Sequence, residues 1–201
     1  MITTGVIPIA CLRVDDVRFE FDSSFVRPEI SDEIEHLADL REQHKIEINP
    51  TTGEVNQTTG VGTTGVIIFP PLSIFGHADS VNTDVYNKPL SGRRATAIYG
   101  LLTRDTDLWE ELFHPHPASG DNWGVKSIQT MLTHLGISRG GAGGKMDDKT
   151  REDVKNFQRA KGLTVDGDPG PKTREKLFVT IYGSTMHVRQ RSTSIKVGQE
   201  G

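Results

Sequence analysis

The chain has 201 residues, of which 34% are hydrophobic and 25% are charged, and its formal net charge is −4. This length is sufficient for one large domain or two modest ones, and the composition is typical of a globular protein rather than a collagen-like or wholly disordered chain. No apolar run approaches the roughly 20 residues of a membrane span, the single cysteine excludes an intramolecular disulfide, and the charge is not basic enough to indicate a nucleic-acid partner. The N-terminal sequence MITTGVIPIAC lacks a basic leader and a full apolar core, so we expect no signal peptide.

The first predicted elements are a strand and a helix. Residues 14–22 alternate apolar and polar side chains, which predicts a half-buried strand with Val17, Phe19 and Phe21 on one face. After Pro28, apolar residues recur at helical spacing and predict an amphipathic helix. Its inward stripe comprises Ile30, Ile34, Leu37 and Leu40. The following Gly/Thr/Asn-rich stretch, 49–65, has no helical period and indicates an exposed loop or a ragged hairpin.

A second strand and helix follow this stretch. The dipeptide Pro70-Pro71 interrupts an apolar run, so the predicted strand is limited to residues 72–77. A polar turn over 79–88 then leads to a helix that we expect to open at Ser91, a residue type that favours the N-cap position. A further short helix is predicted over 107–113.

The charge distribution indicates two modules. Residues 1–120 carry 9 basic and 18 acidic side chains, whereas residues 121–178 carry 11 basic and 8 acidic ones. The prolines, glycine and polar residues of 114–120 predict a linker at the point where the sign changes. We therefore expect a first domain over 1–113, a second over 121–178 and a tail over 179–201.

The second module has a purely helical pattern. Its first apolar stripe comprises Val125, Ile128, Leu132 and Leu135. This stripe stops at Gly136, and Thr150 with Asp153 resembles a capping box at the start of the next helix. Lys149-Thr150 and Lys172-Thr173 form a faint internal repeat, each opening a helix after a Gly- and Asp-rich turn. The tail is compatible with a loose strand or with disorder.

An acidic and a basic residue are predicted to meet at one edge of the first module. Asp79 follows the strand 72–77, and Arg94 lies in the first turn of the helix expected to open at Ser91. A guanidinium binds a carboxylate in a forked geometry, an aspartate binds an ammonium group, and free helix N–H groups add to the attraction for an anion. The pair therefore suits a zwitterionic ligand. Alternatively, it is a surface ion pair with no ligand.

The segment around this pair resembles the OmpA-like peptidoglycan-binding domain. The sequences GHAD, YN and LSGRRA match that family's motif in order and spacing, and the resemblance covers about residues 14–113. It implies that Asp79 and Arg94 hold the ammonium and carboxylate of meso-diaminopimelate in the stem peptide of the cell wall. Asn87 falls on the amide that orients this ligand, and Arg93 is left to serve the surface or a neighbouring acid.

The second module resembles a small three-helix peptidoglycan-binding domain. The sequence FQRAKGLTVDGDPGPKT is the specific part of a resemblance that covers about residues 121–178. The two resemblances together imply an α+β chain, in which an OmpA-like α/β sandwich is followed by a small all-α three-helix bundle. Such a chain would carry two wall-binding modules, and joining them would increase avidity for one polymer.

Catalysis is not indicated by any motif. The histidines His77, His114 and His116 could suggest zinc together with Asp79, but HPHP lacks the i, i+4 helical spacing of metalloprotease histidines. No nucleophile elbow, phosphate loop or spaced carboxylate pair is present. We therefore expect a protein that is not an enzyme and that holds neither a metal nor a cofactor.

The leading hypothesis is non-catalytic binding of the peptidoglycan stem peptide at the cell envelope. A second hypothesis is a structural or assembly component of a phage-tail-like or contractile injection particle, which would be cytoplasmic before release and would aim the particle at an envelope. A third is the targeting part of a wall hydrolase. Turnover of purified wall would indicate the hydrolase, and co-purification with large particles would indicate the assembly component.

Overall fold

A computed structural model of the protein describes residues 19–30, 34, 36–37, 43, 46–48, 51, 55–56, 66–68, 72–77, 83–115, 117, 120–138, 143–183 and 195–199. The strands are β1 (Ile46–Ile48), β2 (Val55–Asn56), β3 (Val66–Ile68), β4 (Leu72–Gly76) and β5 (Ile195–Gln199). The helices are the short 3-10 helix η2 (Pro28–Ile30), α2 (Asp84–Thr103), α3 (Thr106–Phe113), α4 (Gly124–His134), α5 (Asp148–Ala160) and α6 (Pro171–Tyr182).

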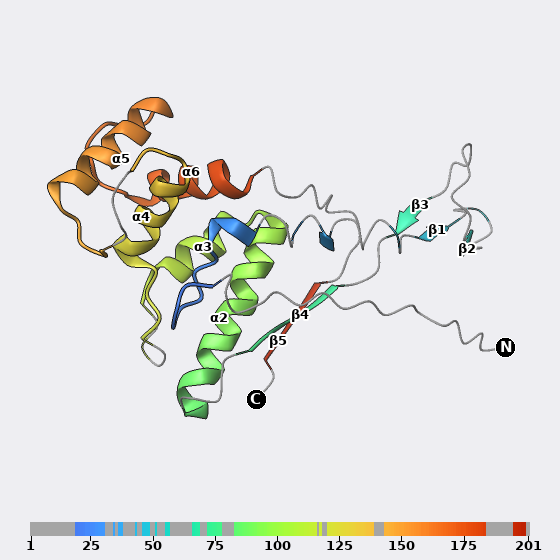
Figure 1. Ribbon diagram of the computed structural model, residues 1–201. Helices are drawn as coiled ribbons and strands as arrows, with labels where there is room; N and C mark the ends of the chain where they lie inside the picture. Colours follow the sequence, from blue (N-terminus) through green and yellow to red (C-terminus); the bar gives the residue numbers. More distant parts are fainter. Residues whose placement is uncertain are drawn as a thin grey trace.

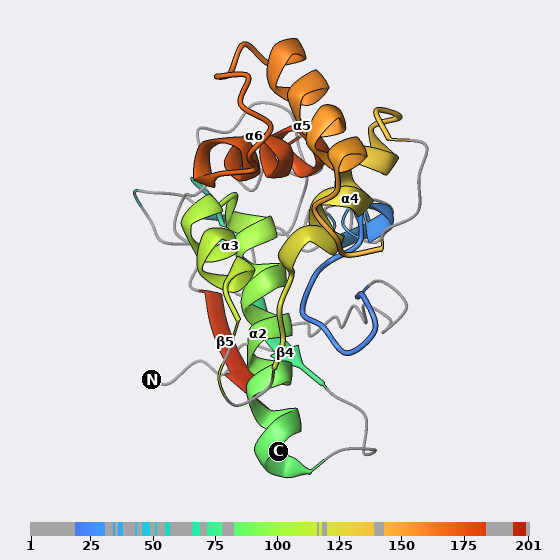
Figure 2. The ribbon, with the colours of Figure 1, turned by 90° about the vertical axis from the view of Figure 1, so that its left-hand side faces the viewer.

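Helices dominate the described part of the chain. The long helix α2 carries β4 and β5 along one side, and α3 follows from its C-terminal end (Figure 1). The helices α4, α5 and α6 gather beside α3, which the view in Figure 2 also shows. Among the described helices, none is both long enough and apolar enough to cross a membrane.

The expected α/β sandwich is wrong. The strands form two small, separate groups: an antiparallel sheet in the order β2-β1-β3, and a parallel pair of β4 with β5. In the described residues, no continuous sheet joins these groups into the layer that a sandwich requires. Two features of the sequence contribute to this result. The Pro70-Pro71 dipeptide interrupts the apolar run before β4, and residues 19–22 of the first predicted strand lie in a turn.

The described end of the first predicted strand, residues 19–22, belongs to a tight turn. Phe19 makes an isolated antiparallel bridge with Val26, so the chain folds back on itself within seven residues. The turn places Asp22 in the left-handed region at φ 55°, a conformation that Asp tolerates better than most residues. As a result, Phe19 is buried at 7% exposure while Phe21 is 88% exposed, although the alternation predicted both on one face. Val17 lies outside the described residues.

The second strand is confirmed, but the helix after it begins earlier than expected. β4 matches the predicted strand 72–77 to within one residue, whereas α2 begins at Asp84 instead of Ser91. Pro89 therefore lies inside the helix, where its missing N–H leaves the carbonyl of Val85 in the first turn without its helical donor. Val85 is highly exposed, so water can reach this turn and the cost of the proline is small.

Several helical predictions are confirmed. Buried Ile30, Ile34 and Leu37 occupy the predicted first stripe, and its last member, Leu40, lies outside the described residues. The predicted helix 107–113 is α3. The predicted stripe of α4 is buried at Ile128 and Leu132 and half-buried at Val125 and Leu135.

The ends of α3 and α4 have the expected local causes. α3 opens with the Asp105 carboxylate accepting hydrogen bonds from two backbone N–H groups of its first turn. α4 ends just before Gly136, which has φ +70° and so stops the helix as predicted.

The boundaries of the last two helices differ from the prediction. The N-cap of α5 is Asp147, whose carboxylate accepts the backbone N–H of Thr150 at 2.7 Å, so the Thr150/Asp153 capping box is wrong. α6 runs to Tyr182, four residues into the predicted tail, and the tail also contributes β5. Of the stretch 49–65, the structure describes Thr51 and β2, and β2 pairs with β1 in a short hairpin.

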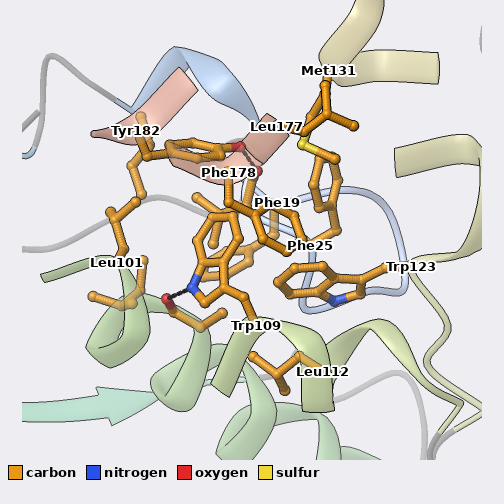
Figure 3. Close-up of a cluster of buried hydrophobic side chains, with 14 of the residues drawn as sticks. Phe19, Phe25, Leu101, Trp109, Leu112, Trp123, Met131, Leu177, Phe178 and Tyr182 are labelled. Carbon is orange, nitrogen blue, oxygen red and sulfur yellow. Dashed lines mark hydrogen bonds between the residues drawn. The ribbon is translucent and has the colours of Figure 1, made fainter. Parts of the chain in front are cut away.

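An aromatic cluster lies at the centre of the core (Figure 3). The Trp109 ring of α3 contacts Phe178 and Tyr182 of α6 edge-on, with ring centroids 4.7 Å apart in both pairs, and Trp123 at 5.2 Å. Phe25 adds a further edge contact to Trp123 at 5.3 Å. Described residues on both sides of the predicted linker 114–120 thus share one core, while the division into two modules remains a prediction.

An ion pair joins α3 to α6 beside this cluster. Arg174 donates from Nε to one Glu110 carboxylate oxygen at 2.8 Å and from Nη2 to the other. Its Nη1 donates to the Pro169 carbonyl at 2.6 Å, and its guanidinium lies 4.2 Å from the centroid of the Phe113 ring. This forked geometry is the strong form of an Arg–carboxylate contact, and the arginine is buried.

We expect this pair to make stability depend on pH in the acid range. The hydrogen bond from Arg174 holds the pKa of the Glu110 carboxyl below its ordinary value of 4.5. Because the folded-state pKa is lowered, the stabilisation is present above pH 4.5 and is lost as the pH falls through the folded-state value. Glu110→Gln should cost about 1 kcal/mol at neutral pH and nothing below the folded-state pKa. Chemical denaturation of both proteins across this range measures the difference, and a difference independent of pH would contradict the assignment.

Candidate functional site

The three predicted ligand-binding residues have different outcomes. Asp79 lies outside the described residues, so its position stays a prediction. Asn87 lies half-buried in the first turn of α2. Arg94 is buried on α2, in the interior of the helix and not in its first turn. The expected contribution of free helix N–H groups near Ser91 is therefore wrong, because the helix begins seven residues earlier.

Arg94 is held at the end of β4. Its Nη1 donates to the carbonyl of His77 at 2.9 Å, and its Nε donates to the carbonyl of Ser23 at 3.1 Å. The guanidinium also lies 5.1 Å from the centroid of the Phe19 ring. His77 directly follows β4 and precedes Asp79 by two residues. The Arg94 guanidinium therefore lies at the strand end that leads to Asp79, the predicted carboxylate.

A glycine makes this approach of strand and helix possible. A Cβ built on Gly76 would lie 1.8 Å from the Ser91 carbonyl oxygen of α2, a distance that no side chain can occupy. The last residue of β4 can therefore lie against α2 only as glycine. This close contact brings the carbonyl of His77 within reach of Arg94.

The turn at Asp22 is fastened to the start of α2. The Tyr86 hydroxyl hydrogen-bonds the Asp22 carboxylate, and this contact raises the pKa of Tyr86 to about 12. The exposed apolar residues Phe21 and Val85 are the sequence neighbours of this pair. Sequence analysis placed Tyr86 in the YN motif and in a polar turn, but it gave no signal of a partner 64 residues away.

Asp121 is the centre of a buried polar junction. Its carboxylate, 1% exposed, accepts hydrogen bonds from the Ser23 hydroxyl at 2.7 Å, from the Ser24 backbone N–H at 3.1 Å and from the Ser24 hydroxyl. Arg93 donates to it from Nε at 2.6 Å, which confirms the prediction that this arginine serves a neighbouring acid. The Trp123 indole N–H completes the junction by donating to the Ser24 hydroxyl at 2.8 Å.

The histidines considered for zinc are described only in part. His77 is exposed at the end of β4, His114 follows α3 with its Nε2 3.6 Å from a Glu110 oxygen, and His116 lies outside the described residues. Among the described residues, no group of three metal-ligating side chains is present.

A buried glutamine organises the loop between α5 and α6. The Gln158 side-chain oxygen accepts the backbone N–H groups of Asp166 and Gly167 at 3.1 and 2.9 Å. Its amide nitrogen donates to the Asp166 carboxylate at 2.7 Å, to the Asp168 carbonyl at 3.0 Å and to the Thr173 hydroxyl at 3.2 Å. One side chain thus satisfies both the loop backbone and the first turn of α6.

Gln129 has the corresponding role one helix earlier. Its oxygen accepts the backbone N–H of Gly144 at 2.8 Å, and its nitrogen donates to the Lys145 carbonyl at 3.0 Å and to the Thr150 hydroxyl at 2.8 Å. Thr150 and Thr173 are the two threonines of the internal repeat seen in the sequence. The repeat is therefore structural: in each copy, a buried glutamine binds the next loop and a threonine at the start of the next helix.

Comparison with known families concerns this helical part. Residues 122–177 match the model of a putative peptidoglycan binding domain. The match covers α4, α5, their two glutamine-bound loops and the first part of α6, so this part of the chain is similar to a peptidoglycan-binding domain. The matching family is described as a binding domain.

Curated relatives match the chain over about half of its length. It is 32% identical over 100 residues to outer membrane porin F of Pseudomonas fluorescens, which covers 49% of this chain and 24% of that protein. It is 33% identical over 90 residues to outer membrane porin F of Pseudomonas aeruginosa, covering 45% and 19%. The chain thus spans a quarter or less of these relatives, and the likeness does not confirm the predicted OmpA-like domain. No solved structure matches the chain.

Proposed function

We propose that the protein binds peptidoglycan without catalysis at the cell envelope. The observation that carries this proposal is the match of residues 122–177 to a peptidoglycan-binding domain. The similarity to outer membrane proteins supports the envelope as the place of action.

We further propose that Asp79 and Arg94 hold the ammonium and carboxylate of meso-diaminopimelate in the stem peptide, and that Asn87 orients it. Arg94 supports this assignment because its guanidinium is buried at the end of β4, three residues before Asp79, and two backbone carbonyls fix its position. A cation that is already oriented binds a carboxylate with little loss of side-chain entropy. The half-buried position of Asn87, two turns before Arg94 on the same helix, is compatible with its role.

Calorimetric titration of meso-diaminopimelate into the full chain tests this site. We expect weak, saturable binding to the wild type and none to Asp79→Asn, which removes the charge that pairs with the ammonium group. Asp84→Asn is the matched control, because it makes the same change at an exposed carboxylate on the first residue of α2. Arg94→Lys keeps the charge but loses the fork, and we expect it to bind at least about tenfold more weakly.

The outcomes separate the Asp79/Arg94 assignment from the general proposal that the protein binds peptidoglycan. Circular dichroism must show that all variants are folded, because Arg94 also holds the Ser23 and His77 carbonyls. If the wild type does not bind diaminopimelate but still sediments with insoluble wall, the Asp79/Arg94 assignment is wrong and residues 121–178 carry the recognition. If neither occurs, the peptidoglycan proposal itself is wrong.

A further inference from the structure

Three basic side chains form a line along α5. Arg151, Lys155 and Arg159 recur at every fourth residue, so they lie on one side of the helix, about 12 Å from first to last. We call these three residues the basic stripe. It flanks the buried face of α5, where Val154, Phe157 and Gln158 lie; Arg151 and Arg159 are exposed and Lys155 is half-exposed.

The stripe brings like charges together on the helix. Like charges at i, i+4 destabilise a helix, and the stripe contains two such pairs in succession. Asp148 and Glu152 lie three residues before Arg151 and Lys155, and Arg159 lies in the last turn, where a cation is favoured. In the described part of the chain, no salt bridge holds Arg151 or Lys155, and Arg159 donates to the neutral Asn156 side chain at 2.8 Å. An external anion can therefore pair with these three charges.

The position of Lys155 is set by the loop that Gln158 binds. The Gly167 backbone lies against the aliphatic part of Lys155, since a Cβ at Gly167 would be 3.0 Å from the Lys155 Cε. Gly167 has φ +78° and donates its N–H to the Gln158 side chain. The loop thus guides the lysine stem toward the surface between Arg151 and Arg159.

Charge complementarity identifies the occupant. Stem peptides carry several carboxylates, and residues 1–120, with 9 basic and 18 acidic side chains, repel them. Residues 121–178, with 11 basic and 8 acidic side chains, attract them. One turn of α5 rises about 5.4 Å, and two residues of an extended peptide span about 7 Å, so successive carboxylates can face successive cations.

We propose that the basic stripe of α5 binds the carboxylates of peptidoglycan stem peptides and orients the domain on the wall. This inference rests on the proposed peptidoglycan binding. It assigns a binding surface within the domain of residues 122–177, separate from the Asp79/Arg94 site.

Sedimentation with purified, insoluble peptidoglycan tests the stripe, using the full chain. Arg151→Gln/Lys155→Gln removes two charges and keeps a polar group on each side chain. Lys172→Gln/Lys176→Gln is the matched control, because it removes another exposed i, i+4 basic pair, on α6. We expect the first variant to bind about fivefold more weakly, as for the loss of two exposed ion pairs, and the second to stay within about twofold of the wild type.

Two further measurements distinguish binding from a structural effect. The Arg151→Gln/Lys155→Gln variant should melt no lower than the wild type, since it removes like-charge repulsion. Its binding should also depend less on salt, because fewer charges are screened. Glycan strands freed of their stem peptides and immobilised on beads should bind the wild type no better than intact peptidoglycan binds this variant.

Three outcomes would overturn the inference. Equal weakening in both double variants would show a general charge effect, and unchanged binding of the α5 variant would show that the stripe does not contact the wall. Full binding to peptide-free glycan would exclude the carboxylates as the ligand. Failure of the wild type itself to bind would instead overturn the proposed function on which this inference rests.

Discussion

Asp121→Ala should lower the free energy of unfolding by about 3–5 kcal/mol, the range for removing one partner of a buried ion pair. The substitution leaves the Arg93 guanidinium next to a cavity without its anion, and it takes away the acceptor of both serine hydroxyls. An unpaired buried charge costs more than the lost hydrogen bonds alone. Chemical denaturation followed by tryptophan fluorescence measures the loss, because both tryptophans lie in the adjoining core.

Two control variants test the cause of this loss. Asp121→Asn keeps the shape and one acceptor oxygen but removes the charge that faces Arg93 and replaces the other oxygen with an NH2 group, so we expect an intermediate loss. Arg93→Met removes the other partner, and the double variant with Asp121→Ala should be more stable than the sum of the two single losses implies, because no unpaired charge remains. A loss below about 1 kcal/mol for Asp121→Ala would show that water replaces the carboxylate.

Trp109→Ala should destabilise the fold by about 3–5 kcal/mol, the range for large aromatic residues in a core. Trp109 contacts Trp123, Phe178 and Tyr182, and its indole N–H donates to the Ala97 carbonyl at 3.0 Å. Removing the ring therefore leaves a cavity at the point where α2, α3 and α6 meet. Circular dichroism during denaturation measures the change, and Trp109→Phe, which retains part of the ring, should lose less.

A neighbouring glycine supplies a sharper control for the same contact. A Cβ on Gly100 would lie 2.6 Å from Trp109 Cδ1, so Gly100→Ala should destabilise the wild type. In the Trp109→Ala background the ring is gone and the Asp105 carbonyl oxygen, 3.3 Å from the built Cβ, remains, so the same substitution should cost much less because alanine favours helix. If Gly100→Ala has the same effect in both backgrounds, the packing described for this pair is wrong.

Asp121→Ala and Trp109→Ala also test whether the described residues on the two sides of the predicted linker unfold together. Asp121 joins the turn at Ser23 to α2, and Trp109 joins α3 to α6. A shared core predicts one cooperative transition, in which fluorescence and circular dichroism coincide. Both the Arg94 site and the basic stripe of α5 would then rest on the same core, and destabilising that core would affect both.

Local sequence signals predicted the elements that have local causes. The helix α3 was predicted over 107–113, although its Asp105 cap was not, and α4 ends where Gly136 takes a positive φ. The threonine repeat at Thr150 and Thr173 was also visible, because its members follow similar turns. Its partners Gln129 and Gln158 looked like ordinary helix residues, since the amides act on loops that follow in the chain.

Longer-range contacts explain the errors. The alternation in residues 14–22 is equally compatible with a strand and with the hairpin that the structure has, and the difference depends on Asp121, 98 residues away from Ser23. The late start predicted for α2 came from giving Pro89 and Ser91 their usual roles as helix boundaries. In the fold, β4 and the Asp22 turn pack on α2, and this tertiary packing outweighs the cost of one proline.

The sequence by itself determined the helical character of residues 121–178 and their resemblance to a peptidoglycan-binding domain, and it left Arg93 to the surface or a neighbouring acid. Each of these depends on residue spacing or on charges that must be neutralised when buried. Only the tertiary structure decided that Asp121 is that acid, that the predicted sandwich is absent from the described residues, and that Arg94 binds the end of β4. Such contacts depend on how distant segments pack, and periodicity within one segment carries no information about its distant partner.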